Sequence, residues 1–132
     1  MQSQNRYRAE ADMMATARRV ATTDAAAELA DQAWAALITA ANHAGLAARW
    51  RTVAAQERQT AAALNQPRDA YAMRYAPRQP TEMAAAWTER AAQSQRIALA
   101  HEQAAAEWGD SGAALSAQAA TAQRLGDRHR DE

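Results

Sequence analysis

Apolar side chains recur every three or four residues along most of the chain, a spacing typical of helices that bury one face. The clearest stretch runs from Thr81, a candidate N-cap followed by the acidic Glu82, to Trp108, without Gly or Pro. One face of this stretch carries Met83, Trp87, Ile97 and Trp108, together with Arg90, Ser94, His101 and Ala104. The pattern predicts an amphipathic helix whose partly polar face needs other helices to cover it.

The first part of the chain predicts two further helices. After residues 1–5, which we expect to fray, a helix can run from Arg6 to Ala21. Thr23 or Asp24 can then cap a second helix, so a break is predicted at Thr22-Thr23-Asp24. One row of residues keeps a seven-residue spacing across this point and favours a continuous helix instead: Met13, Val20, Ala27, Trp34 and Ala41.

Glycines predict where the chain turns. Gly45 suits the residue after a helix C-terminus, which makes Asp24–Asn65 an antiparallel helical hairpin. The run Gly109-Asp110-Ser111-Gly112 predicts a turn inside a second hairpin, Thr81–Leu125. Gly126 would end the last helix, and residues 127–132 would form a disordered charged tail.

The fold expected from these elements is all-α. We predict a single domain, 1–132, built as an antiparallel helical bundle of four to five helices: two hairpins plus an N-terminal helix. The connection between the hairpins, 66–80, holds all three prolines of the chain.

Composition changes the picture of the core. Alanine supplies 41 of the 64 hydrophobic residues, which leaves 23 larger ones, and the chain has no Phe. Fully burying a Leu-sized side chain contributes roughly 1.5–3 kcal/mol and a methyl group much less. A core this thin favours additional burial, through self-association or a protein partner.

Charge and cysteine content exclude several classes. The net charge is zero, with 15 acidic residues against 15 arginines and no lysine, so no overall field attracts nucleic acid or an anionic membrane. The absence of cysteine excludes disulfides and zinc–thiolate sites. The polar N-terminus is not a signal peptide, and no apolar run is long enough to span a bilayer. We therefore expect a cytoplasmic protein without membrane contact, with leaderless export left open.

Candidate catalytic chemistry is sparse, so we expect no enzyme, no cofactor and no metal site. The sequence has no HExxH motif, no glycine-rich phosphate loop and no nucleophile elbow. His101 is the one histidine on an apolar stripe, and the positions one turn away are Ile97, Ala98, Ala104 and Ala105, none of them polar. This pattern favours a packed interface histidine over a general base or metal ligand.

The interface candidates are Trp87, Arg90, His101 and Trp108. Arg90 either keeps its charge at the rim with its stem buried, or pairs with an acid on a neighbouring helix or a second chain. The four tryptophans are either the large members of an alanine-rich core or, in at least one case, an exposed anchor.

Two functions follow. The first is a non-enzymatic α-helical protein-interaction or scaffold module that self-associates or belongs to a larger assembly. The alternative is an accessory nucleic-acid-binding domain of a DNA-processing system, in which arginines contact phosphates and tyrosines stack on bases. Its contact residues would be Arg68, Tyr71, Arg74, Tyr75 and Arg78.

Overall fold

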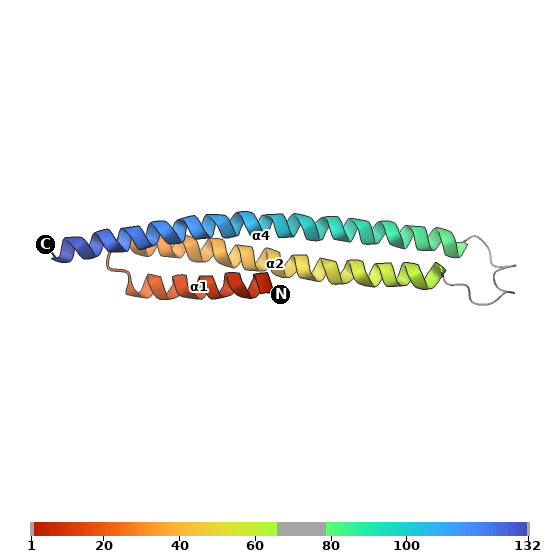
Figure 1. Cartoon of the computed structure of the whole chain (residues 1–132), viewed down its shortest axis with the longest axis horizontal. Coiled ribbons are helices and arrows are strands. Elements are labelled where there is room, and N and C mark those ends of the chain that lie inside the picture. The colour runs from red at the N-terminus through yellow and green to blue at the C-terminus, as the bar shows by residue number, and fades with distance from the viewer. Residues whose placement is uncertain (1, 66–78, 132) are drawn as a thin grey trace. The chain divides into compact units, whose positions relative to one another are not determined.

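The computed structural model describes residues 2–65 and 79–131, and within them three α-helices account for everything except the short link 21–23. Helix α1 spans Gln2–Val20, α2 spans Asp24–Asn65 and α4 spans Gln79–Asp131. Helix α1 packs against α2, and α2 packs against α4 (Figure 1). The all-α prediction is confirmed. The predicted four to five helices are wrong, because each predicted hairpin is one continuous helix.

The break before Asp24 is confirmed, and Thr23 caps the helix that follows. The backbone N–H of Ala26 donates to Thr23 Oγ1 at 3.1 Å, and the N–H of Ala27 donates to the Thr23 carbonyl at 3.0 Å. The first bond satisfies an amide group that has no backbone partner in the first turn of a helix, and the second is the first ordinary hydrogen bond of the helix. The local hydrogen bonding therefore outweighs the seven-residue spacing that runs across the link.

The predicted turns at Gly45 and at Gly109–Gly112 are wrong, because these glycines lie inside α2 and α4. No described glycine has a positive φ, so none uses the backbone freedom of a turn. Each instead lies where another side chain crosses the helix. A Cβ would come within 2.8 Å of the Gln4 amide at Gly45, 2.5 Å of the Tyr7 ring at Gly109 and 2.7 Å of Leu37 at Gly112. These glycines permit close approach.

Helix α4 is longer than predicted at both ends. It begins at Gln79, two residues before Thr81, so Thr81 lies in the first turn and is not the cap. It continues through Gly126 and through the predicted tail as far as Asp131.

The link before α2 supplies the contacts that hold this last part of α4. Gln123 accepts a hydrogen bond from the Thr22 N–H at 3.1 Å and donates to Thr22 Oγ1 at 3.0 Å. A Cβ at Gly126 would lie 2.5 Å from Thr23 Cγ2, so glycine here leaves room for the Thr23 side chain against α4. Because the last part of α4 packs against this link, the helix does not end at Gly126 as the sequence predicted.

The chain divides into two compact units. The three-helix unit comprises Met1–Gly45 and His101–Glu132, and contains α1 with parts of α2 and α4. The two-helix unit is Leu46–Ala100, and its described residues are the remaining parts of α2 and α4.

A seven-residue repeat of small residues forms the contact between α2 and α4 in each unit, and we call it the small-residue seam. On α2 it consists of Ala26, Ala33, Ala40, Ala47, Ala54 and Ala61, and all six are buried. On α4 it consists of Ala84, Ala91, Ala98, Ala105, Gly112, Ala119 and Gly126, and these too are buried. A strict seven-residue repeat is the spacing of coiled-coil contacts. Small residues on both helices bring their axes to the short end of the roughly 8–10 Å packing range.

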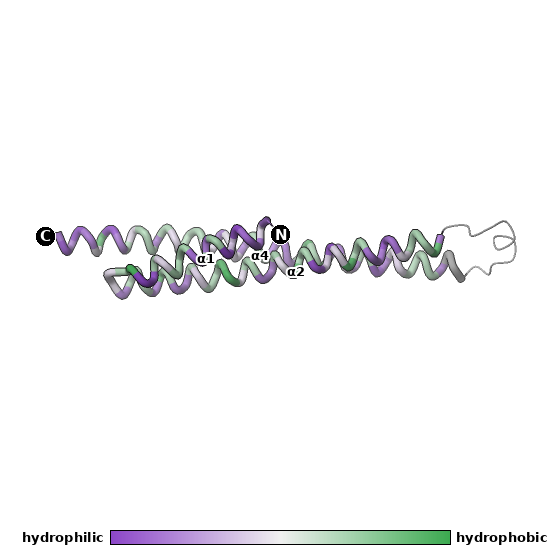
Figure 2. Tube along the Cα trace, turned by 90° about the horizontal axis from the view of Figure 1, so that it is seen from below, coloured by the Kyte–Doolittle hydropathy of each residue, from purple (hydrophilic) through white to green (hydrophobic). Residues whose placement is uncertain are grey.

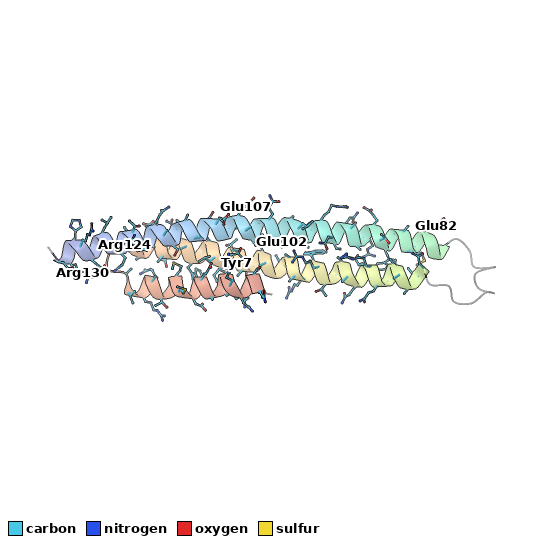
Figure 3. All side chains as sticks on the ribbon, in the orientation of Figure 1. Tyr7, Glu82, Glu102, Glu107, Arg124 and Arg130 are labelled. Carbon is cyan, nitrogen blue, oxygen red and sulfur yellow. The ribbon has the colours of Figure 1, made fainter. Side chains whose placement is uncertain are left out.

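This seam leaves little room for large side chains in the interior. Almost every buried hydrophobic residue is alanine, and Leu37, at 2% exposure, is the largest side chain that is fully buried. In the three-helix unit Tyr7 adds a ring to the core, and Figure 3 shows it directed from α1 towards the neighbouring helices. Hydropathy alternates along every helix without a long apolar segment (Figure 2).

Alanine at two of the glycines should have opposite effects on stability. Gly112→Ala forces a methyl group against the fully buried Leu37 and should lower the free energy of unfolding by about 1–2 kcal/mol, despite the better helix propensity of alanine. Gly45→Ala meets only the end of the flexible Gln4 side chain, so it should raise the free energy of unfolding by about 0.5–1 kcal/mol. Urea denaturation followed by circular dichroism measures both. Equal effects of the same sign would contradict the close-approach role of Gly112.

Candidate interaction surface

A buried carboxylate lies in the two-helix unit, where the pattern along the sequence did not single it out. Glu57 is 7% exposed, and it accepts a hydrogen bond from the buried Ser94 hydroxyl at 2.5 Å. Its second oxygen lies 3.4 Å from Nε of Arg90. An isolated buried carboxylate is costly, and these two donors on α4 satisfy it.

The sequence allowed two interpretations of Arg90. The structure shows the one in which Arg90 pairs with an acidic residue on a neighbouring helix. Its side chain stays 62% exposed, and its guanidinium carbon lies 4.4 Å from the centre of the Trp87 ring. Arg90 therefore lies over the Trp87 ring while it pairs with Glu57. Its guanidinium group stays at the edge of the helix pair. Its role towards a partner protein stays a prediction.

His101 has a polar partner that spacing along its own helix could not show. In the three-helix unit, its Nδ1 lies 3.0 Å from Nδ1 of His43 on α2, and the two rings are 5.2 Å apart between centroids. Both side chains are partly buried. One ring donates and the other accepts, which requires at least one of them to be neutral. The two histidines thus form a hydrogen-bonded pair between α2 and α4.

None of the four tryptophans is fully buried. Trp34 and Trp108 are 43% and 45% exposed, while Trp50 and Trp87 are partly buried. Beside Trp34, a shallow groove of about 540 Å³ separates α1 from α2, and the 2.9 Å ion pair between Arg18 and Asp31 spans the two helices there. The interpretation as buried core residues is therefore wrong for Trp34 and Trp108, and an anchor role for these exposed rings stays a prediction.

Large apolar side chains form a line along one edge of the two-helix unit, and we call it the apolar strip. Its members are Leu46 and Val53 on α2, and Met83 and Ile97 on α4. They are 38%, 37%, 50% and 38% exposed, in that order. Leu46 and Val53 are seven residues apart, and Met83 and Ile97 are two such steps apart with Arg90 between them, so each pair lies on one side of its helix.

The contacts across the seam place both halves of the strip on the same edge. Glu57 contacts Ser94, and the two helices are antiparallel. Val53 lies one turn before Glu57, and Ile97 lies about one turn after Ser94. Val53 and Ile97 are therefore at the same level along the helix pair. On the other edge Arg58 meets Gln95 at 3.5 Å. That edge, the polar flank, carries Arg51, Arg58, Thr88 and Gln95. Four exposed apolar side chains thus lie on one edge of the helix pair together with Arg90, whereas the other edge carries Leu99 one turn after Gln95.

The residues of the nucleic-acid alternative, 68–78, lie outside the described part of the chain, so that alternative stays a prediction. Within the described residues, no group of three or more His, Asp or Glu side chains is placed to hold a metal ion. No described helix combines the length and the apolar character needed to cross a bilayer.

Comparison with protein-family models, curated proteins and solved structures gave no match to this chain.

Truncation at Ser94 should cost more stability than truncation at Arg90. Ser94→Ala removes a buried donor from Glu57 and should lower the free energy of unfolding by about 1–3 kcal/mol, since the buried carboxylate loses a hydrogen bond. Arg90→Ala removes an arginine that is 62% exposed from the buried Glu57. Water screens the exposed guanidinium and can enter the space that it leaves, so the expected loss is about 0–1 kcal/mol. Thr52→Ala, whose hydroxyl bonds only to its own helix, is the control. Chemical denaturation ranks the three, and a larger loss at Arg90 would contradict this assignment.

The histidine pair should be measurable by a double-mutant cycle of His43→Ala and His101→Ala. At pH 8 the two residues should show a favourable coupling of about 0.5–1.5 kcal/mol, the contribution of one hydrogen bond. Replacing either histidine alone should cost nearly as much as replacing both, since either change breaks the hydrogen bond between the rings. A coupling close to zero would contradict a direct imidazole–imidazole bond.

Proposed function

We infer that the protein is a non-enzymatic α-helical interaction or scaffold module, which self-associates or is part of a larger assembly. The observation that carries this proposal is the apolar strip of the two-helix unit, whose four members are each more than one third exposed. In the described residues of that unit, no third helix lies against the α2–α4 pair.

The distribution of large and small residues supports this inference. The chain has few large apolar side chains, and each would stabilise the fold by burial at roughly 25 cal/mol per Å² of apolar surface. Yet the seam between α2 and α4 is occupied by alanine and glycine, and the larger residues lie at its edge. Exposed apolar side chains that cluster among polar ones are typical of a surface that another protein covers.

The interface residues expected from the sequence fit this proposal to different degrees. Trp87 and Arg90 lie on the same side of α4 as Met83 and Ile97, and the contact between their side chains gives that edge an aromatic and cationic centre. Trp108 offers a separate exposed ring on α4 in the three-helix unit. His101 is occupied with His43, so its part in an interface would be indirect.

A photo-crosslinking amino acid at Val53 should capture a protein when the chain is expressed in the cells from which it comes. The same amino acid at Ala55 should not capture that protein. The two positions lie on the same turn of α2 but about 200° apart around the helix. Because Val53 belongs to the apolar strip and Ala55 does not, adducts should form from Val53 alone. Mass spectrometry of the adduct identifies the partner, including another copy of the chain. Equal labelling from both positions, or none from Val53, would remove the proposal.

A further inference from the structure

We propose that the apolar strip binds an acidic amphipathic helix of another protein. The apolar face of that helix would cover the strip, and its carboxylates would pair with Arg49 and Arg90. This inference rests on the proposed function and adds to it the chemistry of the partner.

The exposed charges beside the apolar strip are arginines. Arg49 lies one turn after Leu46 and one turn before Val53, so the three residues share one side of α2, and Arg49 is exposed. Arg90 lies midway between the two α4 members of the strip and is 62% exposed. Each helix therefore brings one positively charged side chain to this edge.

Acidic side chains do not balance these arginines at the surface. The described residues of the two-helix unit include three acidic residues: Glu57, Glu82 and Glu89. Glu57 is buried. Glu82 and Glu89 each precede a residue of this edge by one position, so they lie about 100° away around α4, and Glu89 pairs with Arg96 at 3.4 Å. The exposed charge along the strip is therefore positive, and a carboxylate complements it.

Both arginines have hydrogen-bond donors that a partner can use. No ion pair between described residues includes Arg49. Arg90 contacts Glu57 through Nε, and a guanidinium carries four further N–H donors on its terminal nitrogens. The planar fork formed by these donors matches the two oxygens of a carboxylate. The Trp87 ring, 4.4 Å from the guanidinium carbon of Arg90, helps to hold that fork in place.

A second copy of the chain fits this edge less well. In a two-fold contact the same surface appears on both sides, so each Arg49 would approach a surface that carries arginines. Like charges that meet in an interface are unfavourable. An acidic partner places carboxylates where a copy would place arginines.

The shape of the strip suits a helix. Its members are seven residues apart on α2 and fourteen apart on α4, so they form two lines along the helix axes. Met83 and Ile97 are about 21 Å apart along the axis, and a helix of about four turns covers that length. In the three-helix unit, α1 packs against α2, and the 2.9 Å ion pair between Arg18 and Asp31 joins the same two helices. A helix with acidic residues beside its apolar face would make a contact of this kind with the two-helix unit.

The partner segment that is crosslinked from Val53 supplies the probe for this inference. Mass spectrometry of the adduct should place the crosslink in an amphipathic helix with aspartate or glutamate beside its apolar residues. That segment, made as a fluorescent peptide, should bind the full chain, and fluorescence anisotropy measures its dissociation constant. Binding should weaken as the salt concentration rises, because ions screen exposed charge pairs.

Charge reversal at one arginine on each edge then tests the location. Arg49→Glu should raise the dissociation constant by about tenfold or more, because like charges now meet. Arg49→Lys keeps the charge and should stay within about threefold of the wild type. The matched control, Arg58→Glu, makes the same change in net charge on the polar flank, so its dissociation constant should stay near that of the wild type. A peptide in which lysine replaces the acidic residues should bind Arg49→Glu better than it binds the wild type. Circular dichroism verifies that each variant remains folded.

A captured segment without acidic residues beside its apolar face would overturn the acidic partner, and so would a segment of this same chain. Equal losses of binding from Arg49→Glu and Arg58→Glu would also overturn it, since only the net charge would then matter. These results would leave the proposed function in place, because Val53 would still contact a protein. The absence of any crosslink from Val53 would remove the proposed function as well.

Discussion

The close approach of α2 and α4 along the small-residue seam is the constraint on which the rest of the structure depends. Every seventh residue on each helix is alanine or glycine and is buried, so the two backbones come close together along this line. Larger buried side chains between the helices face small residues: Leu37 lies against Gly112, and Glu57 against Ser94. Methyl groups contribute little burial each, and the contact gains its stability from many small close contacts along its length. This explains how a chain with so few large hydrophobic residues forms long paired helices.

The same constraint determines where large side chains are placed. Several of the large side chains lie beside the seam: Trp34, Met83 and Ile97 are each more than one third exposed. In the three-helix unit, α1 supplies Tyr7 and Met14 to a core that also includes Leu37 and Ile38. The described residues of the two-helix unit have no such third helix, and the large side chains at its edge stay partly exposed. Exposed apolar surface is thus a consequence of the way in which the helices pair.

Periodicity and local chemistry were sufficient to predict helices and the break at Thr23, because both depend on neighbouring residues. The glycines were misinterpreted because their role depends on side chains far along the chain: Gly109 accommodates Tyr7, and Gly112 accommodates Leu37. A signal was available in the sequence, since alanine or glycine recurs at each seventh position from Ala84 to Gly126. The larger residues Met83, Ile97 and Trp108 lie at the edge of the contact between α2 and α4. The centre of that contact consists of small residues, which a pattern of large apolar side chains does not reveal. The partner of Arg90, Glu57, and the partner of His101, His43, required the pairing of α2 with α4 to be known.

A seam made of repeated alanines raises the question of what fixes its register, since sliding α4 by seven residues exchanges one small residue for another. The contacts that would not survive such a shift are the ones made by residues outside the repeat pattern. In the three-helix unit, Leu37 would meet Ala105 or Ala119 in place of Gly112, and a methyl group would occupy the space that glycine leaves. In the two-helix unit, Glu57 would lose the Ser94 hydroxyl, and Trp87 or His101 would take that position. A buried polar contact of this kind adds little stability beyond satisfying its own groups, but it makes the alternative registers costly. We therefore infer that Glu57, Ser94 and the helical glycines specify which alanines meet, while the alanines themselves determine only how closely the helices approach.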